Sequence, residues 1–268
     1  MAMALCWSLL FLPACRNLGT GRSGAAQITL AGSTSVEPFA ELLAERYMQS
    51  HPSSPSINVQ GGGSSSGIQA ALSGAADIGM SSRHLKGDEL DQGLVTRLIA
   101  RDAIAIVVHP SNAVSDLTLA QVRDIFSGAV ANWKDVGGED SPIVVITREE
   151  GSGTRGAFEE LVMGSARITP SALRQDSNGA VRVIVASDRH AVGYVSLGLV
   201  NVRVKALRLG GVVASVENVL NGSYGLSRPF LFLWRGDLDP GAQGYVDYVL
   251  SAEGQGQLAH EGLVTGGK

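Results

Sequence analysis

The amino-acid sequence predicts an α/β fold whose sheets are mostly parallel, and three observations support this prediction. Short apolar runs of strand length alternate along the chain with segments of helical periodicity. Loops of glycine, serine and threonine separate several strands from the helix that follows. The 268 residues are 44% hydrophobic and 17% charged, so the chain can bury a sizeable core. Alternating strands and helices are typical of parallel sheets, because a helix forms the crossover between successive strands.

The first half of the chain repeats one plan of strand, small-residue loop and helix. Ile28 and Leu30 indicate a short strand, and the apolar spacing from Phe39 to Tyr47 indicates a helix that ends before Pro52. Ile57 begins the next repeat of this plan. In chain order we expect a strand at 28–30, a helix at 39–47, a strand at 57–59, a helix at 66–73, a strand at 77–79 and a buried strand at 102–110.

The second half of the chain continues the alternation and ends in helices. The run LTLAQVRDIFSGAVANW has helical spacing before a turn, and PIVVIT is an apolar run of strand length. In chain order we expect a helix and turn at 117–133, a strand at 142–147, a helix after residue 154, strands at 190–198 and 204–211, and a helical C-terminus at 239–264.

The first residues, MAMALCWSLLFLPACRN, look like a bacterial lipoprotein signal with Cys15 as the lipidated residue. The apolar run is too short for a transmembrane helix. It departs from the usual signal because no Lys or Arg precedes it and because Pro13, two residues before the cysteine, is an unusual residue inside the lipobox. The alternative is a buried N-terminal helix. We therefore expect a signal segment at 1–15, a flexible tether at 16–26, and a lipid-anchored protein outside the cytoplasmic membrane.

Composition argues against several classes of function. The formal net charge is −4 and aromatic residues make up 5%, whereas a nucleic-acid partner favours a basic patch with stacking rings. Both cysteines lie within the first 15 residues, so the remaining chain has neither an internal disulfide nor thiol chemistry. The five histidines are scattered without metal-ligand spacing. We expect no nucleic-acid partner, no cofactor and no metal.

Three loops share one composition and one place in the predicted fold. They are residues 32–35 (GSTS), 61–66 (GGGSSS) and 151–154 (GSGT), each between a predicted strand and a predicted helix. Ligands of open α/β sheets bind beyond the carboxyl ends of the strands, where such loops lie. A flexible linker is the alternative for the second loop, but a linker is not expected between a strand and its helix.

The third loop lies within TREEGSGTRGAFEELV, which places an arginine before a small-residue turn and a helix. Backbone N–H groups at a helix start lack intrahelical partners, and the helix dipole is positive there, so an oxyanion can bind. Gly151 and Gly153 allow a close approach, Ser152 and Thr154 add hydroxyl donors, and Arg148 can bind two oxygens at once. Ordinary N-capping is the alternative reading of these residues.

These residues resemble those of the phosphate-binding proteins of bacterial ABC transporters. The resemblance extends from residue 27 to the C-terminus and rests on AGSTSVEPFAELLAERY, GGGSSSGIQAALSGAADIGMSSRHL, LTLAQVRDIFSGAVANWKDVGG and TREEGSGTRGAFEELV, in the family's order. It implies a two-lobed fold with two crossover strands and phosphate held between the lobes. We expect lobe one at 27–108 plus 212–268 and lobe two at 109–211, with the crossovers near 109–118 and 207–213.

The resemblance also implies which groups bind phosphate. They are hydroxyl and backbone N–H groups of the three loops, Ser82 after the strand at 77–79, and one arginine: Thr34, Ser35, Ser64, Ser82, Arg148, Ser152, Gly153 and Thr154, with Ser33, Ser65 and Arg83 as further candidates. An ion pair is the alternative role for Arg83.

Ser82 departs from the pattern of well-studied relatives. They carry a carboxylate at this position, two residues after the small residue that follows Asp-Ile-Gly, and it accepts a hydrogen bond from protonated phosphate. A serine hydroxyl can donate or accept a hydrogen bond. The role of accepting a hydrogen bond from protonated phosphate therefore does not carry over to this chain. We expect Asp77 to brace the strand end rather than to contact the anion.

The favoured function is therefore a phosphate receptor, expected to be a monomer, that delivers phosphate to ABC transporter permease subunits. Alternatives are a receptor for sulfate, arsenate or molybdate, and a surface phosphate sensor or adhesin. An enzyme acting on phosphorylated substrates is disfavoured, because the loop hydroxyls have no adjacent general base in the sequence pattern.

Overall fold

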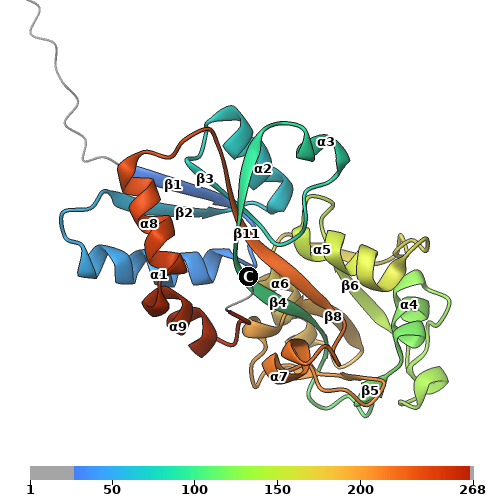
Figure 1. The fold of residues 1–268 in the computed structure, drawn as a ribbon. Helices are drawn as coiled ribbons and strands as arrows, with labels where there is room; N and C mark the ends of the chain where they lie inside the picture. Colours follow the sequence, from blue (N-terminus) through green and yellow to red (C-terminus); the bar gives the residue numbers. More distant parts are fainter. Residues whose placement is uncertain (1–26, 266–268) are drawn as a thin grey trace, which may run out of the picture.

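A computed structural model describes residues 27–265 of the chain. The predicted signal segment, Cys15 and the predicted tether lie outside the described residues. Most strands form a sheet with the order β2-β1-β3-β11-β4-β8-β6-β7, and helices surround it (Figure 1). The α/β prediction is confirmed, and parallel strands at each end of the sheet are joined by antiparallel strands in its middle.

The first end of the sheet has three parallel strands with helices packed against them (Figure 1). Its elements are β1 (Gln27–Gly32), α1 (Glu37–Ser50), β2 (Ser56–Gly61), α2 (Ser64–Ser73), β3 (Ile78–Ser81), α3 (Gly87–Leu90), α8 (Pro240–Leu250) and α9 (Ala252–His260). Helix α2 begins two residues earlier than the sequence predicts, because its start includes the serines that we assigned to the loop.

The second end of the sheet consists of β8, β6 and β7, which are also parallel. The elements on this side of the molecule are β5 (Asp116–Leu117), α4 (Leu119–Ser127), β6 (Val144–Arg148), α5 (Gly153–Phe158), β7 (Leu173–Gln175), α6 (Asn178–Ser187), β8 (Ala191–Ser196), β9 (Lys205–Ala206), β10 (Arg208–Leu209) and α7 (Val216–Leu220). Strands β5 and β10 pair with each other in a separate two-stranded sheet. A π-helical turn, Glu159–Met163, continues α5.

Two long antiparallel strands lie next to each other in the middle of the sheet. Strand β4 (Leu94–Val108) pairs along its first part with β11 (Ser227–Arg235) and along its last part with β8. Both strands lie at the centre of the molecule between the two groups of helices (Figure 1). They are the two crossover strands of the two-lobed fold.

The buried apolar residues form two main cores, one at each end of the sheet. Ile99, Ala100, Phe230, Phe232 and Trp234 pack in the first core, whereas residues 103–108 pack in the second together with Tyr224 and Leu226. The chain thus passes between the cores near 101–103 and near 226–229. These passages lie a few residues before one predicted boundary and about 15 residues after the other, because β4 and β11 continue through both cores without a loop to mark the change.

No helix within residues 27–265 is long and apolar enough to span a membrane.

Candidate functional site

The three small-residue loops meet between the two cores. The hydroxyl of Ser35, in the first loop, lies 2.8 Å from the hydroxyl of Thr154 at the start of α5. The backbone N–H of Ser65, in the second loop, donates to the carbonyl of Gly151 over 3.1 Å. Each loop follows a strand end and precedes a helix, as the sequence predicts. Residues more than 80 positions apart in the sequence therefore form one polar cluster.

Gly153 allows the two sides to approach closely. A Cβ atom at this position would lie 2.1 Å from the Oγ of Ser64 and 2.6 Å from the Oγ of Ser82. These distances are too short for any side chain, so only glycine fits between the two hydroxyls. Its neighbour Ser152 caps α5 by accepting a hydrogen bond from the N–H of Arg155. The capping role considered for this turn is therefore present in the structure.

Arg148, the last residue of β6, is only 1% exposed and is held on several sides. Its Nε and Nη2 atoms donate to the carboxylate of Glu149, and Nη2 also donates to the hydroxyl of Thr34 over 3.1 Å. The carbonyls of Gln175 and Asp176 accept further bonds. Its buried Nη1 has no hydrogen-bond partner among residues 27–265. The guanidinium is therefore fixed while one strong donor is left available.

Three buried serine hydroxyls lie together beside the glycine. The Oγ of Ser33 donates to the Oγ of Ser82 over 2.9 Å, and the Oγ of Ser64 lies 3.4 Å from the same atom. Ser64 also accepts a bond from the backbone N–H of Ser82 over 3.0 Å. The structure thus brings Ser82 into one cluster with two other predicted residues, Ser33 and Ser64.

A buried ion pair lies beneath these hydroxyls. Arg228 of β11 donates to Asp102 of β4 from Nε over 3.0 Å and from Nη2 over 2.8 Å, and both residues are 1% exposed. Burial raises the pKa of the Asp102 carboxyl, an effect that the charge of Arg228 opposes. Arg228 also donates to Ser82 over 3.3 Å and to Ser35 over 3.1 Å. The site therefore contains a second guanidinium.

The sequence analysis did not identify the ion pair of Arg228 and Asp102. It also did not identify the neighbouring Asn178, whose side-chain N–H donates to Ser35 over 2.8 Å. A signal for the pair was nevertheless present. Arg228 begins the apolar run RPFLFLW, and Asp102 begins the apolar run DAIAIVV. Each of these runs has the apolar character of a buried strand but carries one charged residue, and the two charges are opposite in sign. An unpaired buried charge is costly, so each charge is expected to have a partner of opposite sign.

Arg83 and Ser65 form a separate contact. The guanidinium of Arg83 binds both carboxylate oxygens of Glu89 at 2.7 and 2.8 Å and donates to Ser65 over 3.1 Å. The hydrogen bonds from Arg83 hold the pKa of the Glu89 carboxyl below its ordinary value. Arg83 thus makes an ion pair, the alternative considered for it, although the pair is buried rather than exposed. Asp77 accepts a bond from the N–H of Thr29 and braces the strand end, as expected.

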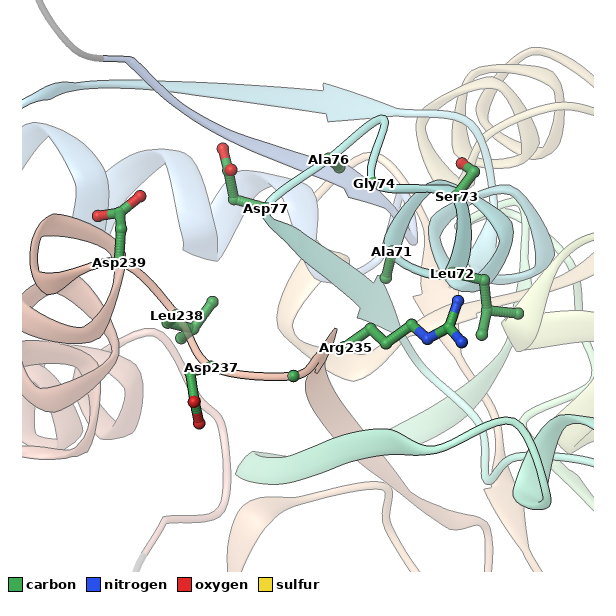
Figure 2. A pocket seen from close by; sticks show the side chains of 11 residues that line it. Ala71, Leu72, Ser73, Gly74, Ala76, Asp77, Arg235, Asp237, Leu238 and Asp239 are labelled. Carbon is green, nitrogen blue, oxygen red and sulfur yellow. The ribbon is translucent and has the colours of Figure 1, made fainter.

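A separate surface pocket with a volume of about 380 Å³ lies away from this cluster (Figure 2). It is lined by residues at the end of α2, in the turn before β3, and at the end of β11 with the loop that follows, among them Asp77, Arg235 and Asp239. Asp77 braces β1, and Asp239 caps α8. These carboxylates are already used by the fold, and none of the three loops contributes to the pocket, so the candidate site is the cluster between the cores.

The chemistry of the cluster is that of an anion site. Its side chains offer guanidinium, amide and hydroxyl donors, and no group of His, Cys, Asp and Glu among residues 27–265 is arranged to hold a metal ion. Among residues 27–265, the hydroxyl groups of the cluster contact other hydroxyls, guanidinium groups and amides. A fixed cation among hydroxyl donors can bind an oxyanion.

The fold and the buried donors between its cores define a two-lobed binding protein. The chain belongs to the PBP superfamily, since the model of the PBP superfamily domain matches residues 19–253. The chain is 30% identical over 232 residues to the phosphate-binding protein PstS of Bacillus subtilis, covering 85% of this chain and 77% of the relative. It is 30% identical to PstS of Pseudomonas aeruginosa over 276 aligned residues, covering 91% of this chain and 84% of the relative.

Solved structures show the same likeness. A putative phosphate ABC transporter substrate-binding protein from Clostridium perfringens, solved with bound phosphate, matches with 42% identity and a TM-score of 0.87, covering 90% of this chain and all of that one. An ABC-type phosphate transport receptor from Vibrio cholerae matches with 38% identity and a TM-score of 0.74, covering 89% of this chain and all of that one.

Proposed function

We propose that the protein binds inorganic phosphate between its two lobes and delivers it to an ABC transporter for uptake. The observation that carries the proposal is the guanidinium of Arg148. It is buried, fixed by Glu149 and Thr34, and keeps a donor without a partner among the described residues. A buried donor of this kind is costly unless a ligand accepts its bond. The phosphate-binding relatives support phosphate as that ligand.

The binding residues in this proposal are among those predicted from the sequence. The oxyanion is held by Arg148 and Thr154 from one lobe and by Thr34, Ser35 and Ser64 from the other. Ser82, Ser152, the backbone of Gly153 and the neighbouring Ser33 complete the set. Ser65 and Arg83 support the second loop through the ion pair with Glu89 rather than by contact with the anion.

The site connects the two lobes, so binding and closure are coupled in this proposal. Thr34 and Ser35 contact Arg148 and Thr154 across the two cores. A ligand can favour the closed form only by making better contacts there. Phosphate that bridges the donors of both lobes meets that requirement. The closed, loaded protein then presents phosphate to the permease subunits.

The location and anchoring proposed for this chain follow from its first residues. Lipidation at Cys15 would hold the folded domain, as a monomer, outside the cytoplasmic membrane, with residues 16–26 as the tether. The protein would act as a receptor and not as an enzyme, because the described hydroxyls have no neighbouring base.

Calorimetric titration of residues 27–268 with phosphate, sulfate, arsenate and molybdate tests the proposal. Phosphate is expected to bind at one site per chain and more tightly than sulfate or molybdate. Tighter binding of sulfate or molybdate would favour the alternative of another oxyanion receptor. The absence of binding by all four anions would exclude the proposed function.

A further inference from the structure

The hydroxyl of Ser35 has its two acceptor positions filled by protein donors. Arg228 Nη2 donates to its Oγ over 3.1 Å, and Asn178 Nδ2 donates over 2.8 Å. The orientation of the Asn178 amide is fixed, because its oxygen accepts a bond from the backbone N–H of Ser196. A hydroxyl has two lone pairs and one hydrogen. The hydrogen of Ser35 therefore points outward, toward Thr154 or toward a ligand that replaces this contact.

The hydroxyl of Ser82 is constrained in the same way. Arg228 Nη1 donates to its Oγ over 3.3 Å, and the hydroxyl of Ser33 donates over 2.9 Å. Both acceptor positions are again filled, so Ser82 has only its hydrogen to offer. A serine that could either donate or accept is thus limited to donation by its surroundings.

Arg228 is the residue common to both hydroxyls. It contacts one hydroxyl from each of its two terminal nitrogens, while Asp102 holds it through Nε and Nη2. Arg228 and Asp102 also face each other in the register of the two crossover strands. The guanidinium is therefore set by the hinge strands and not by a mobile loop. Because its partner is a carboxylate, the pair adds no net charge to the site.

We propose that Arg228, held by Asp102 and assisted by Asn178, determines selectivity by fixing Ser35 and Ser82 as hydrogen-bond donors. This inference rests on the proposed phosphate site. Arg228 is a positioning residue in this role. Ser82 presents a donor and not an acceptor to the anion, because Ser33 and Arg228 fill both acceptor positions of its hydroxyl. The site then favours the fully deprotonated edge of an oxyanion and does not require the anion to carry a proton.

Two consequences follow for binding. Phosphate loses a proton as pH rises through neutrality, and a donor-lined site accepts the dianion at least as well as the monoanion. Phosphate affinity is therefore expected not to fall from mildly acidic to mildly alkaline pH. Sulfate, which has no proton to offer, meets no unpaired carboxylate at Ser82 and is expected to compete measurably with phosphate.

The test uses the double variant Asp102→Asn/Arg228→Gln. It removes both charges together, so that no unpaired charge stays buried, and it removes the guanidinium that donates to both serines. Calorimetry measures phosphate and sulfate affinity at mildly acidic and mildly alkaline pH. Arg235→Gln is the control, because Arg235 ends the same strand and is exposed. Circular dichroism checks that each variant is folded.

The double variant is expected to bind phosphate about tenfold more weakly at alkaline pH, a loss typical of one charge-assisted hydrogen bond. Its loss at acidic pH should be smaller, because the freed serines can accept the proton of the monoanion. Sulfate binding should weaken at both pH values. If the double variant does not fold, Asn178→Ala replaces it in the test. This variant frees an acceptor position of Ser35 only, and its phosphate affinity is also expected to fall more at alkaline than at acidic pH.

The outcomes separate the two proposals. A wild-type protein that does not bind phosphate would exclude the proposed function and the inference with it. A wild-type protein that binds phosphate, with variants of unchanged affinity and pH profile, would overturn only the role of Arg228. Wild-type phosphate affinity that falls steeply with rising pH would also overturn this role. Another group of the site would then accept a hydrogen bond from protonated phosphate.

Discussion

Replacing Gly153 by alanine tests whether the closed contact between the lobes is needed for binding. The new Cβ would lie 2.1 Å from the Oγ of Ser64 and 2.6 Å from the Oγ of Ser82. The first distance is more than 1 Å shorter than an ordinary contact of about 3.5 Å. Neither serine can rotate freely to relieve it, since Ser64 accepts a bond from the N–H of Ser82 and Ser82 is held by Arg228.

The clash exists only when the lobes are closed, so its cost falls on the closed form. Overpacking of this kind costs about 1–3 kcal/mol. Because phosphate must drive closure, Gly153→Ala is expected to weaken phosphate binding by roughly fivefold to 150-fold. The thermal unfolding midpoint without phosphate should change little if the free protein is open. Calorimetry and thermal unfolding with and without phosphate measure the two effects.

Gly151→Ala is the matched control in the same loop. Its new Cβ would meet only the Cβ of Ser65, at an ordinary 3.7 Å. The control should bind phosphate almost as the wild type does. Equal losses in the two variants, or no loss in Gly153→Ala, would refute the steric reasoning.

Three other predictions concern the anchor, the lobes and one buried ion pair. Cys15→Ser is expected to release the protein from the membrane fraction, and a variant that stays membrane-bound would contradict lipidation. Phosphate is expected to reduce the radius of gyration in small-angle scattering, whereas an unchanged radius would show that the lobes do not close on it. The pKa of Glu89 is lowered in the folded protein, so its pair with Arg83 stabilises the fold above the ordinary pKa of the carboxyl, and this stabilisation is lost as pH falls through the lowered pKa. Glu89→Gln should therefore reduce the free energy of unfolding by about 3 kcal/mol at neutral pH, with a smaller difference in acid, because it leaves Arg83 buried without a charged partner. Denaturant unfolding of wild type and variant at neutral and at acidic pH measures this difference in the free energy of unfolding. An equal difference at both pH values would contradict the role of the ionised Glu89 carboxylate.

The sequence predicted the parts of the fold that repeat a local plan. The strand, loop and helix around Ser35 and around Ser64 were found because glycine, serine and apolar periodicity mark each transition. Strand β11 was not predicted, although it is the longest apolar run near the C-terminus. Pro229 makes this run a poor candidate for a central strand. In the structure Pro229 lies beyond the part of β11 that pairs with β3, so its missing N–H breaks no bond there.

The sequence predicted the site residues that lie in or next to the three loops, but not those that lie within the central strands. Arg148 and the hydroxyls of the three loops stand out because polar small residues follow apolar strands. Arg228 and Asp102 are 126 positions apart and come together only through the pairing of β11 with β4. Asn178 looks like an ordinary residue at a helix start, and only the tertiary fold shows that it contacts Ser35. Such long-range pairs are set by topology, which local patterns do not encode.

The central claim is that Arg148 and the converging hydroxyls bind phosphate, and calorimetric titration of wild type and Arg148→Ala with phosphate tests it most directly. A charge-assisted hydrogen bond contributes about 1.5–3 kcal/mol, so the variant should bind roughly tenfold to more than a hundredfold more weakly. Arg174→Ala, at an exposed position of the neighbouring strand β7, should bind as wild type. A wild type that binds no phosphate, or an Arg148→Ala variant within about threefold of a binding wild type, would contradict the account.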